Sequence, residues 1–207
     1  MRQQTLLKIV NLMRTNLDKG LTILDISKRL KIGYRPAYMH IAGMEKEDLI
    51  KVEKVGNAKQ CFLNLSNVKT KHLLEEADIT KKEEILKKTP KLRGVLNPLI
   101  QNLAERFISE LHSIVLFGSY AKGTSVKNSD VDLLVIVNNL KNKTLREAIE
   151  QECASYQHSY NIKISPLITD VWEFKKMLQS KEVNVGKESR QYGISVHGHE
   201  FFWRLLQ

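Results

Sequence analysis

An apolar residue recurs every three or four positions near the start of the chain, at Leu6, Ile9, Val10, Met13 and Leu17. This spacing predicts an amphipathic first helix that ends near Gly20. The segment LTILDISKRLKI predicts a second, short helix, which Gly33 ends. A third helix is predicted from about Tyr34, with Pro36 in its first turn, where a missing amide costs least.

After Asp48 the pattern changes from helical spacing to alternation. LIKVEKV and KQCFLNL alternate polar and apolar residues around GNA, which is typical of a two-stranded hairpin. Three helices, a tight turn between the second and third, and a hairpin make up a winged helix-turn-helix. The segment from about Leu6 to Ser66 resembles small archaeal and bacterial winged-helix DNA-binding domains over its whole length.

That resemblance implies a DNA-reading face on the third helix. Ala37, Ile41 and Met44 share its core side, and the exposed side is left to Arg35, Tyr38, Met39 and His40, with Lys46 as a further candidate. The first four would enter the major groove. Lys54 and Lys59 flank the wing and would contact phosphates. A homodimer would place two such helices about one DNA turn apart. Winged helices also serve as protein–protein modules, so an N-terminal domain that never touches DNA is the alternative.

The rest of the chain divides into two further segments. Residues 67–94 are rich in charge with a thin apolar stripe, and they predict a helical linker of one or two helices that packs on its neighbour or dimerises. Residues 95–207 predict a compact α/β domain. Its elements are a helix over about 95–111, the strands SIVLFG and VDLLVIV, a helix near 144–160, the strand NIKISPLI, a helix near 171–178, and a closing ISVHG before the helical HEFFWRLL.

Composition narrows the class of protein. The 207 residues are 42% hydrophobic and 27% charged, and no apolar run reaches the roughly 18 residues of a membrane span. We therefore expect a soluble, cytoplasmic protein with no membrane partner. Cys61 and Cys153 stand in no CxxC arrangement, so we predict two buried free thiols rather than a zinc ribbon or a disulfide.

The net charge of +10 is concentrated near the N-terminus. Up to His72 there are 14 Lys and Arg against 6 Asp and Glu, a surplus of 8. A basic region of this kind favours duplex DNA as a partner, and a solvated basic surface is the alternative.

Two acids, Asp130 and Asp132, lie one residue apart in FGSYAKGTSVKNSDVDLLVIV. Unpaired carboxylates are costly to bury, so their place beside LLVIV needs a reason. Strand alternation puts both acids on one face, with Val131 and Leu133 on the other. Two carboxylates so placed can share hard cations that hold a triphosphate, which predicts a phosphate and metal site.

Gly118 and Ser119 close the strand before these acids. The absence of a side chain at Gly118 lets phosphate oxygens approach backbone amides, and the Ser119 hydroxyl can donate. Ten residues separate this pair from Asp130, enough for the chain to turn through a short helix and return as the next strand. The loop is therefore expected beside the acids.

The run GSYAKGTSVKNSDVDLLV resembles the nucleotidyltransferases of the polymerase-beta superfamily, and fits their minimal nucleotidyltransferase branch closely. The resemblance implies that Gly118, Ser119 and Ser129 bind the nucleoside triphosphate (NTP). It also implies that Asp130 and Asp132 are catalytic and coordinate Mg²⁺ or Mn²⁺. The expected fold class is α+β, with a winged helix-turn-helix over residues 1–66, a helical linker over 67–94, and a nucleotidyltransferase domain with a small mixed sheet over 95–207.

Active members of that superfamily usually add a third carboxylate from a later strand. The corresponding strand here is NIKISPLI, where Lys163 and Ser165, or Ile162 and Ile164, would face the site, and none is acidic. Asp170 and Glu173 are the nearest acidic candidates. Loss of a catalytic base costs on the order of 10²-fold to 10⁴-fold in rate. Nucleotide binding is therefore the stronger prediction, and efficient transfer the weaker one.

The tail adds two features. Lys187, Arg190 and Tyr192 are predicted to lie in a solvated loop, with screening of triphosphate charge as the alternative for the two cations. His197 and His199 have the spacing of paired ligands, but no third ligand with suitable spacing accompanies them.

Two functional hypotheses remain. In the first, the protein is an Mg²⁺-dependent enzyme that moves a nucleoside monophosphate (NMP) from an NTP to a hydroxyl on a protein, nucleic acid or small molecule. In the second, it is a DNA-binding transcriptional regulator whose nucleotidyltransferase domain is a catalytically weak nucleotide sensor or partner-binding module. The resemblance also implies an antitoxin role with a helical toxin partner.

Overall fold

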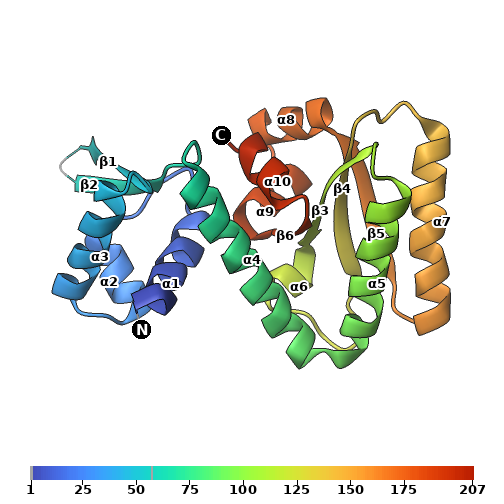
Figure 1. Cartoon of the computed structure of the whole chain (residues 1–207), viewed down its shortest axis with the longest axis horizontal. Helices are drawn as coiled ribbons and strands as arrows, with labels where there is room; N and C mark the ends of the chain where they lie inside the picture. The colour runs from blue at the N-terminus through green and yellow to red at the C-terminus, as the bar shows by residue number, and fades with distance from the viewer. Residues whose placement is uncertain (1, 57) are drawn as a thin grey trace. The chain divides into compact units, whose positions relative to one another are not determined.

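The computed structural model describes residues 2–56 and 58–207, with side chains from Gln4 onward, and it forms two compact units (Figure 1). One unit contains the chain up to Ala77 together with Leu206–Gln207, and the other is Asp78–Leu205. The boundary falls inside one helix, α4 (Val68–Lys88). No helix in the described part of the chain is both long and apolar enough to cross a membrane.

The N-terminal unit has the predicted three helices and hairpin. These are α1 (Arg2–Arg14), α2 (Ile23–Leu30), α3 (Tyr34–Lys46), β1 (Ile50–Val55) and β2 (Ala58–Leu63). Its core includes Ile9, Val10, Ile26, Ala37, Ile41 and Met44. The core side predicted for the third helix is thereby confirmed. Asn57, the middle residue of the predicted hairpin turn, lies outside the described residues.

Two local features set the helix ends in this unit. The first helix was predicted to reach Gly20, but it ends at Arg14. There the side chains of Thr15 and Asn16 both donate to the Leu12 carbonyl at 2.9 Å, so they compete with the helical backbone pattern. Helix α2 begins at a capping box in which Thr22 and Asp25 hydrogen-bond each other's backbone amides.

The middle of the chain forms longer helices than predicted. A single helix, α4, spans residues 68–88, and α5 (Pro90–Arg106) starts five residues before the expected Val95. Pro90 takes the first helical position, where its missing amide is harmless. The predicted end at Leu111 is wrong, because Leu111 already opens strand β3 (Leu111–Phe117).

The C-terminal unit is built on a four-stranded sheet in the order β5-β4-β3-β6. Its other strands are β4 (Val131–Val137), β5 (Ile164–Asp170) and β6 (Ile194–His197). Strands β4 and β5 run parallel and the other pairs run antiparallel, which confirms the predicted small mixed sheet. The remaining helices are α6 (Gly118–Lys122), α7 (Lys143–Tyr160), α8 (Val171–Gln179), α9 (Val185–Tyr192) and α10 (His199–Leu205).

Helices cover both faces of this sheet (Figure 1). Alternate residues of β4, namely Val131, Leu133, Val135 and Val137, belong to one core cluster with apolar side chains of α5 and α7. The opposite face is covered by α8, α9 and α10, where Phe174, Phe202 and Trp203 are buried. Asp132 belongs to this second face by strand alternation.

Helix α9 was not predicted. Lys187, Arg190 and Tyr192 were expected in a loop and instead lie on this helix. The Asn184 side chain caps it by accepting from the Lys187 amide at 3.1 Å. Two glycines let it pack closely. A Cβ on Gly186 would lie 2.6 Å from Cβ of Met177, and one on Gly193 would lie 2.8 Å from Cγ1 of Val115.

Candidate active site

Gly118 and Asp132 meet where β3 gives way to α6. Phe117 pairs with Asp132 across the β3–β4 ladder, and the next residue, Gly118, has a φ of +67°. A Cβ on Gly118 would lie 2.0 Å from Oδ2 of Asp132. Two features favour glycine at this position. The backbone has a left-handed conformation, and the Asp132 carboxylate leaves no room for a side chain. The Gly-Ser loop therefore lies beside Asp132, as predicted from the sequence.

Asp130 precedes β4 and is held by β5. Its Oδ2 forms an ion pair with the Lys163 ammonium and accepts a long hydrogen bond of 3.5 Å from the Ser165 hydroxyl. Of the two pairs that the alternation of NIKISPLI left open, Lys163 and Ser165 are thus the ones that face the acids. The carboxylate of Asp130 raises the pKa of Lys163, so this side chain is a cation at neutral pH.

Asp132 is an acid of the site whose pKa is raised by its surroundings. Burial raises the pKa of its carboxyl, and the negative charges of Asp130 and Glu188 add to the shift, while Lys163 and Lys122 oppose it. The pKa of Asp132 is raised because its ionised form lacks full compensation from the protein. A carboxylate in that state is suited to a bound cation.

Glu188 is the acidic residue that the sequence did not connect with this site. It lies on α9, and its Oε1 forms a 2.8 Å ion pair with Lys122 at the end of α6. The Lys122 ammonium also lies 5.7 Å from the centre of the Tyr192 ring. The polar segment VGKESRQY gives no apolar periodicity that predicts its helix, so only the fold reveals this neighbour.

The two acids nearest to the candidate strand do not reach the site. Asp170 pairs with Val137 at the other end of the parallel β4–β5 ladder, and its Oδ1 accepts from the Glu173 amide as the N-cap of α8. Their candidacy as a third carboxylate was wrong because strand direction carries them away from Asp130. Among the described residues, no three His, Cys, Asp or Glu side chains form a group that could hold a metal ion.

The serines of the motif have different surroundings. Ser119 opens α6 beside Gly118, and its carbonyl accepts from the Thr124 amide at 2.9 Å. The Ser129 hydroxyl accepts from the Val126 amide at 2.8 Å, which closes a turn immediately before the acids. Ser129 therefore shapes the loop that delivers Asp130, and its predicted nucleotide contact stays a prediction.

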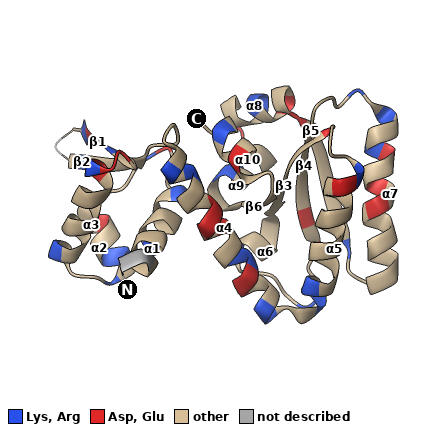
Figure 2. Ribbon diagram, in the orientation of Figure 1, with Lys and Arg blue, Asp and Glu red and all other residues tan. Residues whose placement is uncertain are grey.

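The DNA-facing residues predicted in the N-terminal unit are mostly exposed. On α3, Arg35 is exposed, Tyr38 and Met39 are 50% and 62% exposed, and His40 is half-buried. Lys54 and Lys59 are exposed and lie directly opposite each other in the hairpin. In Figure 2, basic positions are spread over these helices and the hairpin, with acidic positions among them. DNA contact by these residues stays a prediction.

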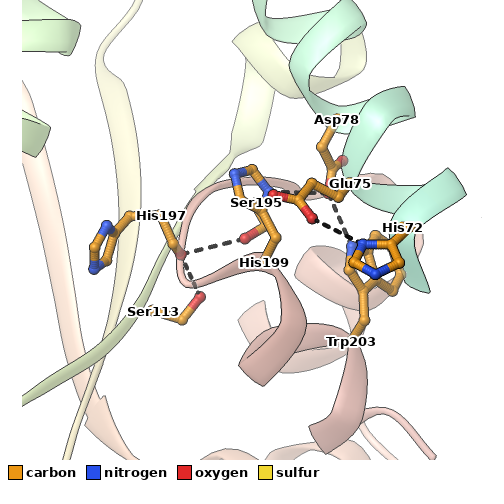
Figure 3. Close-up of polar contacts among 8 residues, drawn as sticks. All are labelled: His72, Glu75, Asp78, Ser113, Ser195, His197, His199 and Trp203. Carbon is orange, nitrogen blue, oxygen red and sulfur yellow. Dashed lines mark hydrogen bonds and ion pairs between the residues drawn. The ribbon is translucent and has the colours of Figure 1, made fainter. Parts of the chain in front are cut away.

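The two histidines of the tail do not converge. The His197 carbonyl accepts from Ser113 at 2.9 Å and from Ser195 at 3.3 Å, and the His197 ring points away from His199 (Figure 3). His199 instead lies near the buried Asp78, 4.0 Å from Nδ1 to Oδ2. The same Oδ2 accepts from Nε1 of Trp203 at 3.0 Å. This polar cluster joins α4 to α10 within the C-terminal unit.

Both cysteines are free and buried, which confirms the prediction for them. Burial raises the pKa of the Cys61 thiol to about 11 and that of Cys153 to about 12. Neither thiol is a thiolate at neutral pH, so neither is a nucleophile of the site.

Comparison with known proteins points to the C-terminal unit. A family model described as "Nucleotidyltransferase domain" matches residues 96–192. Two Methanocaldococcus jannaschii proteins are similar to the chain. "Putative protein adenylyltransferase MJ1305" is 40% identical over 85 residues, which are 38% of this chain and 55% of the relative. "Putative protein adenylyltransferase MJ0141" is 32% identical over 87 residues, which are 42% of this chain and 80% of the relative.

The matched stretch thus spans only about half the length of the first of these relatives. Among solved structures, a mutant of the toxin-antitoxin pair MntA-HpeT covers 53% of this chain at 16% identity, with a TM-score of 0.34. A TM-score this low supports no conclusion about partners. The family match includes Gly118, Asp130, Asp132, Lys163 and Glu188, and stops short of the N-terminal unit.

Proposed function

Because this chain belongs to the nucleotidyltransferase domain family, we propose that it transfers a nucleotidyl group from an NTP to an acceptor hydroxyl with the help of Mg²⁺ or Mn²⁺. Asp130 and Asp132 hold the cation, and Gly118 and Ser119 receive the triphosphate. The names of the two archaeal relatives favour ATP as the donor and a protein side chain as the acceptor.

One observation carries the proposal, namely the contact between the Gly-Ser turn and the second acid. A Cβ added at Gly118 would lie 2.0 Å from Oδ2 of Asp132, so the Gly118 backbone and the Asp132 carboxylate are in close contact. Phosphate oxygens that approach the backbone at Gly118 would lie beside Asp132. A cation held by that carboxylate can then contact the same phosphates.

The donor set fits a hard divalent cation. Asp130 and Asp132 offer carboxylate oxygens, which Mg²⁺ prefers, and Mg²⁺ completes its shell with waters and substrate phosphates. Oδ1 of Asp130 and both oxygens of Asp132 accept no hydrogen bond from the described residues, so they can serve as ligands. When bound, the cation would neutralise triphosphate charge and favour ionisation of the acceptor hydroxyl.

The reaction needs little covalent help from the protein. The acceptor oxygen forms a bond to the α-phosphorus, the bond from that phosphorus to the α–β bridging oxygen breaks, pyrophosphate leaves with that oxygen, and the hydroxyl proton passes to solvent water. Catalysis of this kind rests on positioning and on charge neutralisation. Lys122 and Lys163 contribute positive charge near Asp132, where the triphosphate would lie.

The test is transfer of label from α-labelled NTPs to candidate acceptors, with protein hydroxyls tried first. Wild-type protein should label an acceptor with at least one NTP. The double variant Asp130→Asn with Asp132→Asn should lose transfer by at least about 10³-fold, because both ligands are removed at once. Asp170→Asn is the matched control, since Asn also caps helices and this residue lies at the far end of β5. Equal transfer by the double variant would sink the proposal.

A second function is favoured by the N-terminal unit, namely binding of duplex DNA. Like charges directly opposite in a hairpin repel each other, and Lys54 and Lys59 keep that arrangement near the hairpin tip. An anionic partner would relieve the repulsion. The exposed Tyr38 and Met39 on α3 provide an apolar and aromatic surface of the kind that enters a groove.

A further inference from the structure

The register of two parallel strands sets Lys163 beside Asp130. Val131 pairs with Ile164 and Asp132 with Ser165, and the Val131 amide donates to the Lys163 carbonyl at 2.8 Å. Asp130 and Lys163 are therefore neighbours at the start of the ladder, with side chains on the same face. The strand register thus brings the two side chains within reach of each other, and they form an ion pair although the Lys163 side chain is 63% exposed.

Lys163 immediately precedes β5 and contacts Asp130, at the start of the segment where the family resemblance leads one to expect a third carboxylate. A lysine in place of the expected carboxylate would change more than one ligand, because a positive group would stand where a negative one was expected. Sites that bind two metal ions hold them about 3.5–4 Å apart between shared carboxylates. The Lys163 ammonium in contact with Asp130 would occupy the position of one of those ions and supply positive charge in its place.

Charge balance points the same way. Three carboxylates with two dications would leave one net positive charge. Two carboxylates, one ammonium and one dication leave the same net charge. A second dication beside Lys163 would raise it by two more units, and cations this close repel one another strongly.

The contacts at Asp130 leave ligands for a single ion. Lys163 and Ser165 both contact Oδ2, while Oδ1 of Asp130 and the carboxylate of Asp132 accept no hydrogen bond from the described residues. No group of three metal-ligating side chains occurs among those residues either. The protein oxygens that are left can hold one ion, whose remaining ligands would come from phosphate and water.

We propose that the Lys163 ammonium replaces one of two active-site cations, so that the site binds one divalent ion per nucleotide. This inference rests on the proposed function, because it takes Asp130 and Asp132 as the metal ligands. The lysine then supplies a fixed positive charge that does not depend on the Mg²⁺ concentration. That charge lies beside Asp130, and the one bound ion would contact the triphosphate.

The experiment counts bound Mn²⁺ by electron paramagnetic resonance at saturating non-hydrolysable ATP analogue, with analogue binding measured separately by equilibrium dialysis. Wild-type protein should bind one Mn²⁺ per bound nucleotide, and Lys163→Asp should bind two. Without nucleotide, Lys163→Gln should bind Mn²⁺ about tenfold more tightly than wild type, because it removes one nearby positive charge. Lys141→Asp makes the same charge change at an exposed lysine beyond the other end of β4, and it should leave the count at one.

Two Mn²⁺ per nucleotide in the wild type, or one in Lys163→Asp with the nucleotide still bound, would overturn the inference. If Lys163→Asp fails to fold, unchanged Mn²⁺ affinity in Lys163→Gln overturns it instead. Absence of analogue binding in the wild type is a different result, since it contradicts the proposed function itself.

Discussion

The two units of this chain present their candidate functional residues in different ways. In the C-terminal unit, Gly118, Asp130, Asp132 and Lys163 are brought together by strand register, and short contacts fix each of them. In the N-terminal unit, the residues predicted to face DNA were chosen by exposure and charge, and Lys54 and Lys59 are placed opposite each other by the pairing of the hairpin strands. A site of the first kind is sensitive to single atoms. A surface of the second kind responds to the sum of its charges.

The largest expected difference between the units comes from the same substitution at two glycines. Gly118→Ala adds a Cβ 2.0 Å from Asp132 and strains a positive φ, so we expect a loss of about 1–3 kcal/mol in stability and the loss of nucleotide binding. Gly43→Ala, in helix α3 with nothing within 4 Å of the added atom, should be neutral or stabilising by up to about 1 kcal/mol. Denaturant unfolding and nucleotide titration check both variants. Full nucleotide binding by Gly118→Ala would show that the close approach of Gly118 to Asp132 is not needed at the site.

The second effect concerns buried hydrogen bonds. Trp203→Phe removes one donor to the fully buried Asp78, and the loss of a partner by a buried polar group costs about 1–3 kcal/mol. In the N-terminal unit, Thr70→Val removes a neutral hydrogen bond to the Leu49 carbonyl, which still accepts from the Asn64 amide at 2.9 Å. That loss should stay below about 1 kcal/mol. Chemical unfolding followed by circular dichroism measures both, and equal losses would contradict the difference.

The N-terminal unit is tested by salt. If Lys54 and Lys59 contact phosphates, replacing both by Ala should reduce the slope of log affinity against log salt by about 1.8, at about 0.9 for each contact. Fluorescence anisotropy with labelled duplex DNA at several salt concentrations gives the slope. Lys141→Ala, in the other unit, should leave it unchanged. An affinity that does not depend on salt, or none at all, would remove DNA from the account.

The smallest expected effect is the loss of folding stability caused by the ionised Asp132 carboxylate at neutral pH. The pKa of Asp132 is raised in the folded state, so folding favours the protonated carboxyl. The protonated carboxyl contributes its full stability below pH 3.8, and this contribution is lost as the pH rises through the pKa of the folded state. At pH 7 without metal, Asp132→Asn should therefore be more stable, by a few tenths of a kcal/mol because solvent screens this half-exposed group. Thermal melts at pH 7 and below pH 4 test this, and the gain should vanish at the lower pH. Added Mn²⁺ should stabilise the wild type alone.

The extent of sequence-based prediction differs between the two regions for physical reasons. Alternation in VDLLVIV predicted the two faces of β4 correctly, and the Gly-Ser spacing predicted the loop beside Asp132. Helical spacing likewise predicted the core side of α3. Local patterns of this kind depend only on the period of a helix or a strand.

What could not be predicted depends on contacts between distant segments. The pairing of Lys163 with Asp130 requires the parallel register of β4 and β5, and Glu188 requires the placement of α9, whose short polar sequence carries no periodic signal. Asp170 looked like a candidate acid because it is close in sequence. Strand direction places it at the other end of the sheet.

A crystal structure with Mg²⁺ and a non-hydrolysable ATP analogue would show directly whether the two acids bind the metal ion. We expect the triphosphate against Gly118 and Ser119, with the metal ion bound by Asp130 and Asp132 and the Lys163 ammonium still beside Asp130. A nucleotide bound elsewhere, or one whose metal ion contacts neither acid, would contradict it.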